Sequence, residues 1–268
     1  MIATAPAVAR TLAAVRLCRP LVHNITNLVV TNTTANALLA LGASPAMVEG
    51  ADEVEAFVGL SDSLVINLGT MTADRAAAMR LAAHAAADLR RPWVLDPVAV
   101  GVLGYRTRLA EDLLRFKPSI IRGNASEILA LAGTDAAGRG VDAAASSEAA
   151  LPVARSLAER TGAVVAVTGA VDYITNGQRV LACRNGHPLM TRVTGMGCTA
   201  TAIVGACLGV EPDPLAAAAH AMALIGVAGE MAAERCRGPG SLQLELLDAL
   251  YLLDEAMLSA RVRLEETP

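Results

Sequence analysis

The chain has 268 residues, of which 54% are hydrophobic and 18% charged, and its formal net charge is −4. This length can build one large core or two small ones, and because no Pro/Gly/Ser-rich linker divides the chain we expect a single domain over residues 1–268. Basic residues form no cluster with interleaved aromatics, and only six residues are Phe, Tyr or Trp. This composition argues against a nucleic-acid partner.

The cysteines and the N-terminus indicate a cytoplasmic location. The five cysteines are odd in number, and their spacings fit neither a disulfide framework nor a zinc site, which predicts a reducing compartment. Arg10 and Arg16 interrupt the apolar N-terminus and so argue against a secretory signal. The longest apolar helical stretch, 215–229, contains His220 and is too short to cross a bilayer, so no membrane partner is expected.

From about residue 60, short β-rich runs alternate with Ala- and Leu-rich segments of helical length. This alternation is typical of a parallel sheet covered by helices. We predict strands at 63–66, 92–95, 119–121 and 163–167, and helices at 72–89 and 147–159. A hairpin is expected over 173–181, turning at Asn176-Gly177. The last third, 197–263, is predicted to form three helices, interrupted around 211–214 and 238–240.

The four predicted strands stop on polar residues or glycine. They run into Asn67, Asp96, the segment 122–124 and Thr168. Ligands of doubly wound sheets bind outside the carboxyl ends of the strands, so these residues predict a shared crevice. The fingerprints of the P-loop and of the Rossmann fold are both missing from the sequence.

The segment Gly195-Met196-Gly197-Cys198 has the pattern of a glycine turn that leads into a helix. Such a turn lets the backbone approach a ligand closely, and the helix start supplies N–H donors and partial positive charge for an anion. The same field is expected to lower the pKa of a thiol at Cys198. A simple helix-entry turn and a small buried thiol are the structural alternatives.

Five blocks of sequence carry a resemblance to a known family. They are Pro-Leu-Val-His-Asn-Ile-Thr-Asn at 20–27, the segment 34–47 that ends in Ser-Pro-Ala-Met, Leu-Asp-Pro-Val at 95–98, Arg-Gly-Asn-Ala-Ser-Glu-Ile at 122–128, and Thr-Gly-Met-Gly-Cys at 194–198. In this order the blocks closely resemble the hydroxyethylthiazole kinase family, over about residues 10–260. Met196 departs from the small residue that is usual in this family's glycine turn.

The resemblance implies a ribokinase-like α/β fold, with a central mostly parallel sheet flanked by helices on both faces. It also implies that MgATP phosphorylates the hydroxyl of 4-methyl-5-(2-hydroxyethyl)thiazole, a salvage step toward thiamine. Members are typically homotrimers with the substrate site at the subunit interface.

The family's catalytic and substrate positions map onto two parts of this sequence. Cys198 matches the base that accepts the hydroxyl proton, and Gly195 and Gly197 match backbone N–H groups that serve the phosphate and the alcohol. Met47 matches a methionine that contacts the thiazole. The other residues expected to shape this pocket are Asn27 and His23, although His23 could equally be a core histidine and Met47 an ordinary strand residue.

The nucleotide and metal positions lie at strand ends. Arg122 and Thr168 match ATP contacts, and Asp96 and Glu127 match carboxylates that organise Mg²⁺ directly or through water. The structural alternatives are that Asp96 caps a turn, that Glu127 belongs to a helix start capped by Asn124, and that Thr168 only ends its strand. Because the protein is acidic, we expect Arg122 to lie close to the start of the helix at 197.

Three other functions remain open at this point. A sibling kinase acting on hydroxymethylpyrimidine or pyridoxal is the nearest, although the 20–27 and 44–47 segments argue against it. A hydrolase that uses Cys198 as a covalent nucleophile would need glycines two positions before and after it, where the chain has Met196 and Ala200. A nucleotide-binding module without catalysis conflicts with the joint presence of Asp96, Glu127 and Cys198.

Overall fold

The computed structural model describes residues 2–133 and 146–267, and its strands form one sheet in the order β2-β1-β3-β4-β5-β6-β7-β8-β9. Neighbouring strands pair in parallel from β2 to β6 and antiparallel from β6 to β9. The strands are β1 (Leu21–Ile25), β2 (Ser44–Ala46), β3 (Ser63–Asn67), β4 (Trp93–Asp96), β5 (Ile120–Asn124), β6 (Val164–Thr168), β7 (Asp172–Thr175), β8 (Val180–Cys183) and β9 (Leu264–Thr267).

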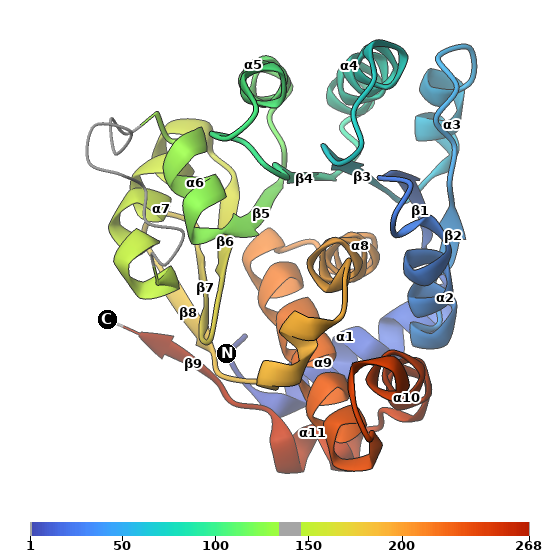
Figure 1. The fold of residues 1–268 in the computed structure, drawn as a ribbon, viewed down its shortest axis with the longest axis vertical. Coiled ribbons are helices and arrows are strands. Elements are labelled where there is room, and N and C mark those ends of the chain that lie inside the picture. The colour runs from blue at the N-terminus through green and yellow to red at the C-terminus, as the bar shows by residue number, and fades with distance from the viewer. Residues whose placement is uncertain (1, 134–145, 268) are drawn as a thin grey trace.

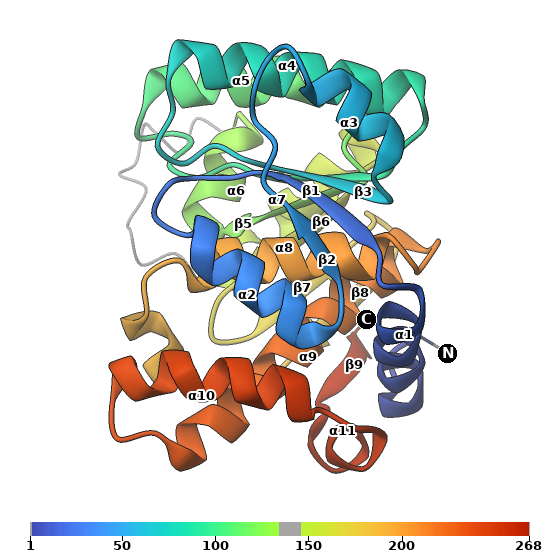
Figure 2. The same cartoon turned by 90° about the vertical axis from the view of Figure 1, so that its right-hand side faces the viewer.

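Helices cover both faces of the sheet (Figures 1 and 2). One face carries α3 (Val54–Leu60), α4 (Ala73–Asp88), α5 (Gly104–Leu114), α6 (Ala125–Leu131) and α7 (Ser147–Thr161). The other carries α1 (Ala5–Cys18), α2 (Thr31–Leu41), α8 (Met196–Leu208), α9 (Pro214–Arg235), α10 (Pro239–Leu252) and α11 (Glu255–Arg261). The predicted α/β class, with a mostly parallel sheet between helices, is therefore confirmed.

The central strands are apolar along their whole length because both of their faces are covered. In β3, Leu64 and Ile66 pack under α4 whereas Val65 faces α8. This period-two division sends alternate side chains into two separate cores. The polar residues at the carboxyl ends of the strands are thus held at fixed positions by apolar residues that precede them.

Helix α9 lies inside the core. It has 22 residues and is long and apolar enough to cross a membrane by length and composition, but 94% of its apolar window is buried inside the protein. The expectation that this stretch is too short for a membrane span was therefore wrong about length, because the helix extends six residues beyond Gly229. Its burial identifies it as a core helix.

The last third of the chain contains more elements than predicted. Four helices and the strand β9 occupy 196–267, where three helices were expected. The additional helix α11 starts at a local cap, since the Asp254 side chain accepts a hydrogen bond from the Met257 N–H. The strand β9 is short, and its Glu265 and Glu266 pair with arginines on the neighbouring β8 side. Such an edge strand has no apolar alternation that a sequence pattern could detect.

Packing of α8 onto the sheet depends on a glycine. A Cβ at Gly205 would lie 2.5 Å from Cγ2 of Val65 and 3.1 Å from Cγ1 of Val22. We predict that Gly205→Ala lowers the free energy of unfolding by about 1–3 kcal/mol, since overpacking a rigid strand outweighs the gain in helix propensity. Urea denaturation measures this change.

Gly240→Ala is the matched control, because a Cβ at this α10 position meets nothing within 4 Å. Its stability should be unchanged or higher by up to about 1 kcal/mol. Equal losses in the two variants would contradict the packing argument.

Candidate nucleotide and substrate site

Gly195 forms the turn that begins α8. Its φ of 77° is left-handed, and a Cβ there would collide with Cγ1 of Val30, so both the backbone and the available space require glycine. None of the described side chains caps α8. The first N–H groups of this helix are consequently available to an external acceptor, as the sequence pattern predicted.

Strand β5 places Arg122 directly over this helix start. A Cβ at Gly197 would lie 2.8 Å from Nη1 of Arg122, so the guanidinium and the backbone are in close contact. The buried Nε of Arg122 has no hydrogen-bond partner among the described residues. The expected closeness of Arg122 to the helix start is present, and it concentrates positive charge at one point.

Asp96, at the end of β4, is a buried carboxylate held by two donors. Its Oδ2 accepts hydrogen bonds from Nδ2 of Asn67 and from Oγ1 of Thr201, both at 2.7 Å. Burial raises the pKa of Asp96 to about 6, although nearby Arg122 and the two hydrogen bonds act in the opposite direction. The side chain therefore binds other side chains and does not cap a turn.

Glu127 has a clear structural task. Its Oε2 accepts from the Asn124 N–H at 2.9 Å while Asn124 accepts from the Glu127 N–H at 3.0 Å, which together form a capping box at the start of α6. Its Oε1 accepts from the Ala99 N–H at 3.0 Å. The helix-start alternative for Glu127 is therefore correct, and the carboxylate is held close enough to Asp96 to raise the pKa of that residue.

Asp96 and Glu127 could supply part of the ligand set of a magnesium ion. Within the described ranges, no group of three or more His, Cys, Asp or Glu side chains could hold a metal. Each carboxylate oxygen has two lone pairs, so oxygens that already accept one hydrogen bond keep capacity for a cation or its waters. Mg²⁺ commonly uses one or two carboxylates together with water and phosphate oxygens, which is what Asp96 and Glu127 could offer.

Cys198 lies in the first turn of α8 and is partly exposed. Its Sγ accepts a hydrogen bond from Nδ2 of Asn27 at 3.2 Å. Burial and the nearby charge of Asp96 raise the pKa of the thiol. The expectation that the helix start lowers this pKa was therefore wrong, because desolvation and the buried carboxylate dominate.

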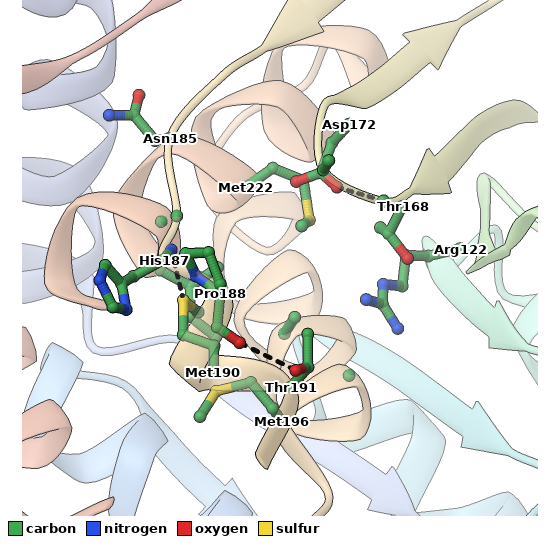
Figure 3. A pocket seen from close by; sticks show the side chains of 17 residues that line it. Arg122, Thr168, Asp172, Asn185, His187, Pro188, Met190, Thr191, Met196 and Met222 are labelled. Carbon is green, nitrogen blue, oxygen red and sulfur yellow. Dashed lines mark hydrogen bonds between the residues drawn. The ribbon is translucent and has the colours of Figure 1, made fainter. Parts of the chain in front are cut away.

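A cavity of about 480 Å³ opens beside Arg122 and the start of α8. Figure 3 shows Arg122 and Thr168 on one side of it and His187, Pro188 and Met190 on the other. Thr168 also donates a hydrogen bond to the Gly123 carbonyl at 3.3 Å, across the ends of β5 and β6. The two predicted ATP contacts and Gly197 thus line one cavity.

The predicted substrate residues lie outside this cavity. Asn27 connects Cys198 to Asn67, and Met47 directly follows β2. His23 is fully buried, with Nε2 at 2.7 Å from the Val48 carbonyl oxygen and its ring edge-on to Phe57. His23 therefore holds the backbone next to Met47 through the Val48 carbonyl, and its buried Nδ1 has no hydrogen-bond partner among the described residues.

Several polar residues of the site were not predicted. Asn67 and Thr201 hold Asp96, and Asp172 accepts from the Gly169 N–H at 2.9 Å at the cavity edge. Asn67 follows the predicted strand 63–66 and was expected to line the crevice, but its hydrogen bond to Asp96 was not predicted. Thr201 and Asp172 carry no sequence pattern of their own, so no signal in one sequence could identify them.

The fold and this site define the class of protein. The structure is similar to a ribokinase-like superfamily protein from Enterococcus faecalis V583, with a TM-score of 0.62 at 13% identity over 86% of each chain, a likeness that supports the fold alone. The chain therefore has a ribokinase-like α/β fold, in which polar strand ends face the start of α8.

Residues 12–256 match the Hydroxyethylthiazole kinase family, and the chain belongs to this family. A protein from Granulibacter bethesdensis named "Hydroxyethylthiazole kinase" is 67% identical over 245 residues, which cover 91% of this chain and 89% of that protein. A structure of hydroxyethylthiazole kinase protein from Pyrococcus horikoshii OT3 has a TM-score of 0.91 and 41% identity, covering 97% of this chain and 99% of the other.

The buried Asp96 should oppose stability while it serves the site. A carboxyl whose pKa is raised to about 6 by burial binds more protons in the folded state than in the unfolded state, so its ionisation lowers stability as the pH rises from about 4 to about 6. We predict that Asp96→Asn raises the free energy of unfolding at pH 7 by about 2–3 kcal/mol and removes phosphate transfer. Urea denaturation at pH 4 and pH 7 measures the first effect.

Thr201→Val provides the comparison, because it removes one donor to Asp96 and leaves the carboxylate buried. This variant should be less stable at pH 7, by about 1–3 kcal/mol. If Asp96→Asn were as destabilised as Thr201→Val, the argument that the ionised Asp96 carboxylate lowers stability at pH 7 would be contradicted.

Proposed function

We propose that this chain transfers the γ-phosphoryl group of ATP to the hydroxyl of 4-methyl-5-(2-hydroxyethyl)thiazole, as a salvage step in thiamine biosynthesis. The observation that carries the proposal is the contact of Arg122 with Gly197 at the uncapped start of α8, in a chain that belongs to the Hydroxyethylthiazole kinase family. A guanidinium and helix N–H groups that converge on one point suit a group whose charge is spread over several oxygens.

The nucleotide is proposed to occupy the 480 Å³ cavity. This volume is within the range of small-molecule sites. Arg122 and Thr168 lie at the end of the cavity that adjoins α8, where they would bind phosphate oxygens. Met190, Met222 and Ile225 supply an apolar part, which suits the flat face of a nucleobase.

Mg²⁺ is proposed to be organised by Asp96 and Glu127. When bound, the ion would neutralise charge on the phosphate oxygens as the transfer proceeds. Asp96 would contribute one carboxylate that Asn67 and Thr201 orient. Glu127, whose two oxygens already accept backbone N–H groups, would act through water.

The alcohol is proposed to bind on the other side of the glycine turn, near Cys198, Asn27 and Met47. There the backbone of Gly195 and the Cys198 thiol can reach the hydroxyl, and His23 holds the Met47–Val48 segment through the Val48 carbonyl. Cys198 would accept the hydroxyl proton at Sγ. Because the pKa of this thiol is raised, only a small fraction is ionised at neutral pH, and positioning would supply most of the catalysis.

We further propose a single domain over 1–268, which includes residues outside the described ranges, in a cytoplasmic homotrimer without nucleic-acid or membrane partners. Leu28 and Val29 directly follow Asn27 and are 69% and 60% exposed. Adjacent exposed apolar side chains suit burial against a second subunit at the substrate side.

The alternatives have less support. A kinase for hydroxymethylpyrimidine or pyridoxal would not account for 67% identity to a protein named "Hydroxyethylthiazole kinase". A cysteine hydrolase needs an activated thiolate, whereas burial raises the pKa of Cys198. A substrate panel with mass spectrometry of the products separates the first alternative, and labelling by a thiol-directed acyl probe separates the second.

The decisive experiment is phosphate transfer from MgATP to hydroxyethylthiazole. We predict that the wild-type protein forms the phosphate ester and that Arg122→Ala lowers kcat/KM for ATP by about a hundredfold, through loss of a charge-assisted phosphate contact. Mass spectrometry and steady-state kinetics measure both. If neither hydroxyethylthiazole nor any other alcohol of the substrate panel is phosphorylated, although ATP binds, the protein is a nucleotide-binding module without catalysis.

The role of Cys198 predicts a pH profile. If the thiolate accepts the proton, kcat rises with pH above 7, because the raised pKa of the thiol leaves few thiolates at neutral pH. Cys198→Ala should lower kcat by about ten- to a hundredfold and flatten this rise. A Cys198→Ala enzyme with full turnover at saturating substrates would exclude the base assignment.

A further inference from the structure

One wall of the cavity is held from behind by the C-terminal segment. Asn185 and Gly186 line the cavity at the end of β8, followed by His187, Pro188 and Met190. The amide of Asn185 points away from Arg122 and Thr168 (Figure 3). The Asn185 amide is therefore free to bind groups behind the wall, and what it binds helps to set the position of the wall residues that follow it.

Asn185 is bound on its far side by the C-terminal segment. Its Oδ1 accepts a hydrogen bond from the Arg263 N–H at 2.7 Å, and its Nδ2 donates to the Arg261 carbonyl at 2.8 Å. Asn185 is only 6% exposed. Buried amides of this kind have few alternative partners, so the three residues are fixed relative to one another.

Glu230 of α9 joins the same network. Its Oε1 accepts from Nδ2 of Asn185 at 3.1 Å, from the Gly186 N–H at 2.9 Å and from the Arg263 guanidinium. The Glu230 side chain is 15% exposed and that of Arg263 is 55% exposed. One carboxylate oxygen thus links the cavity wall to the C-terminal segment through charge-assisted hydrogen bonds.

The wall also fits closely onto α9. A Cβ at Gly226 would lie 2.6 Å from Cβ of Asn185, and a Cβ at Gly229 would collide with Sδ of Met190. The wall therefore rests on a glycine surface that gives it no side chains to lock into. Leu189 and Met190 also pack against the apolar core, and the polar network around Glu230 adds directional hydrogen bonds at Asn185 and Gly186.

We propose that Glu230 is a positioning residue for ATP, and that through it the C-terminal segment 261–263 sets the nucleotide affinity. This segment lies outside residues 12–256, which match the family. The inference rests on the assignment of the cavity to ATP. Glu230 does not line the cavity, so it would act only through residues 185–190.

The test compares Glu230→Ala with Glu266→Ala. Glu266 is the control because it also holds the C-terminal strand, through a two-point pair with Arg179 at 2.7 and 2.9 Å, but it does not touch the wall. We expect Glu230→Ala to raise the KM for ATP by about tenfold, with KM for the alcohol and kcat within about twofold, since two hydrogen bonds to the wall and one to Arg263 are lost. Glu266→Ala should leave all three constants unchanged.

Hydrogen exchange of the free protein supplies a readout that needs no nucleotide. Amides of 184–192 should exchange faster in Glu230→Ala and at the wild-type rate in Glu266→Ala. If Glu230→Ala folds poorly, Glu230→Gln and Arg263→Met are used, with smaller increases of about threefold in KM for ATP. Equal effects of Glu230 and Glu266 variants, or an unchanged KM for ATP, would overturn the inference.

If ATP does not bind in this cavity, the result differs from the one expected when only the role of Glu230 is wrong. In that case Arg122→Ala would also leave the KM for ATP and the binding of a fluorescent ATP analogue unchanged. An effect of Arg122→Ala without an effect of Glu230→Ala would reject only the positioning role.

Discussion

The site depends on the contact between the Arg122 guanidinium and the backbone at Gly197. This contact sets a positive side chain against the positive end of α8. The charge of Arg122 opposes the burial that raises the pKa of Asp96 and of Asp172, and its buried Nε has no hydrogen-bond partner among the described residues. A protein of net charge −4 thereby keeps a concentrated positive point. A phosphate group would satisfy the guanidinium and the helix N–H groups together.

The same constraint explains the glycines of the turn. A Cβ at Gly197 would displace the Arg122 guanidinium, whereas Gly195 is required because the backbone is left-handed and Val30 is adjacent. Met196, between them, lines the cavity with its side chain, so the larger residue at this position leaves the N–H groups of the turn in place. Gly197 lines the cavity beside Arg122, whereas Asn27 and Cys198, which contact each other, are not among its lining residues. Under the proposed function, the two reactants would therefore meet at this turn.

Much of the sheet was predictable because each buried strand is a continuous apolar run that ends on a polar residue. The predicted strand 63–66 corresponds to β3, and the predicted helix 72–89 corresponds to α4 at Ala73–Asp88. The site residues came mainly from resemblance, and the structure brings Arg122, Thr168 and Gly197 to one cavity. The polar network around Asp96 and Glu230 could not be predicted, because Thr201 and Arg263 meet their partners only through tertiary packing. The direction of the Cys198 pKa was also mispredicted, since burial is not visible in a local motif.

The raised pKa values of Asp96 and Cys198 have one origin. Removal from water is the largest cause for both groups, Asp96 at the end of β4 and Cys198 in the first turn of α8. The amides of Asn27 and Asn67 connect them, since Asn27 donates to the Cys198 sulfur and to Asn67, which donates to Asp96. Asp96 also raises the pKa of the thiol directly through its charge. A cation that neutralised the carboxylate would remove this contribution and make the thiolate easier to form. Under the proposed function, the thiolate that accepts the proton would then form mainly when the metal and nucleotide are in place, which would limit proton transfer to the assembled complex.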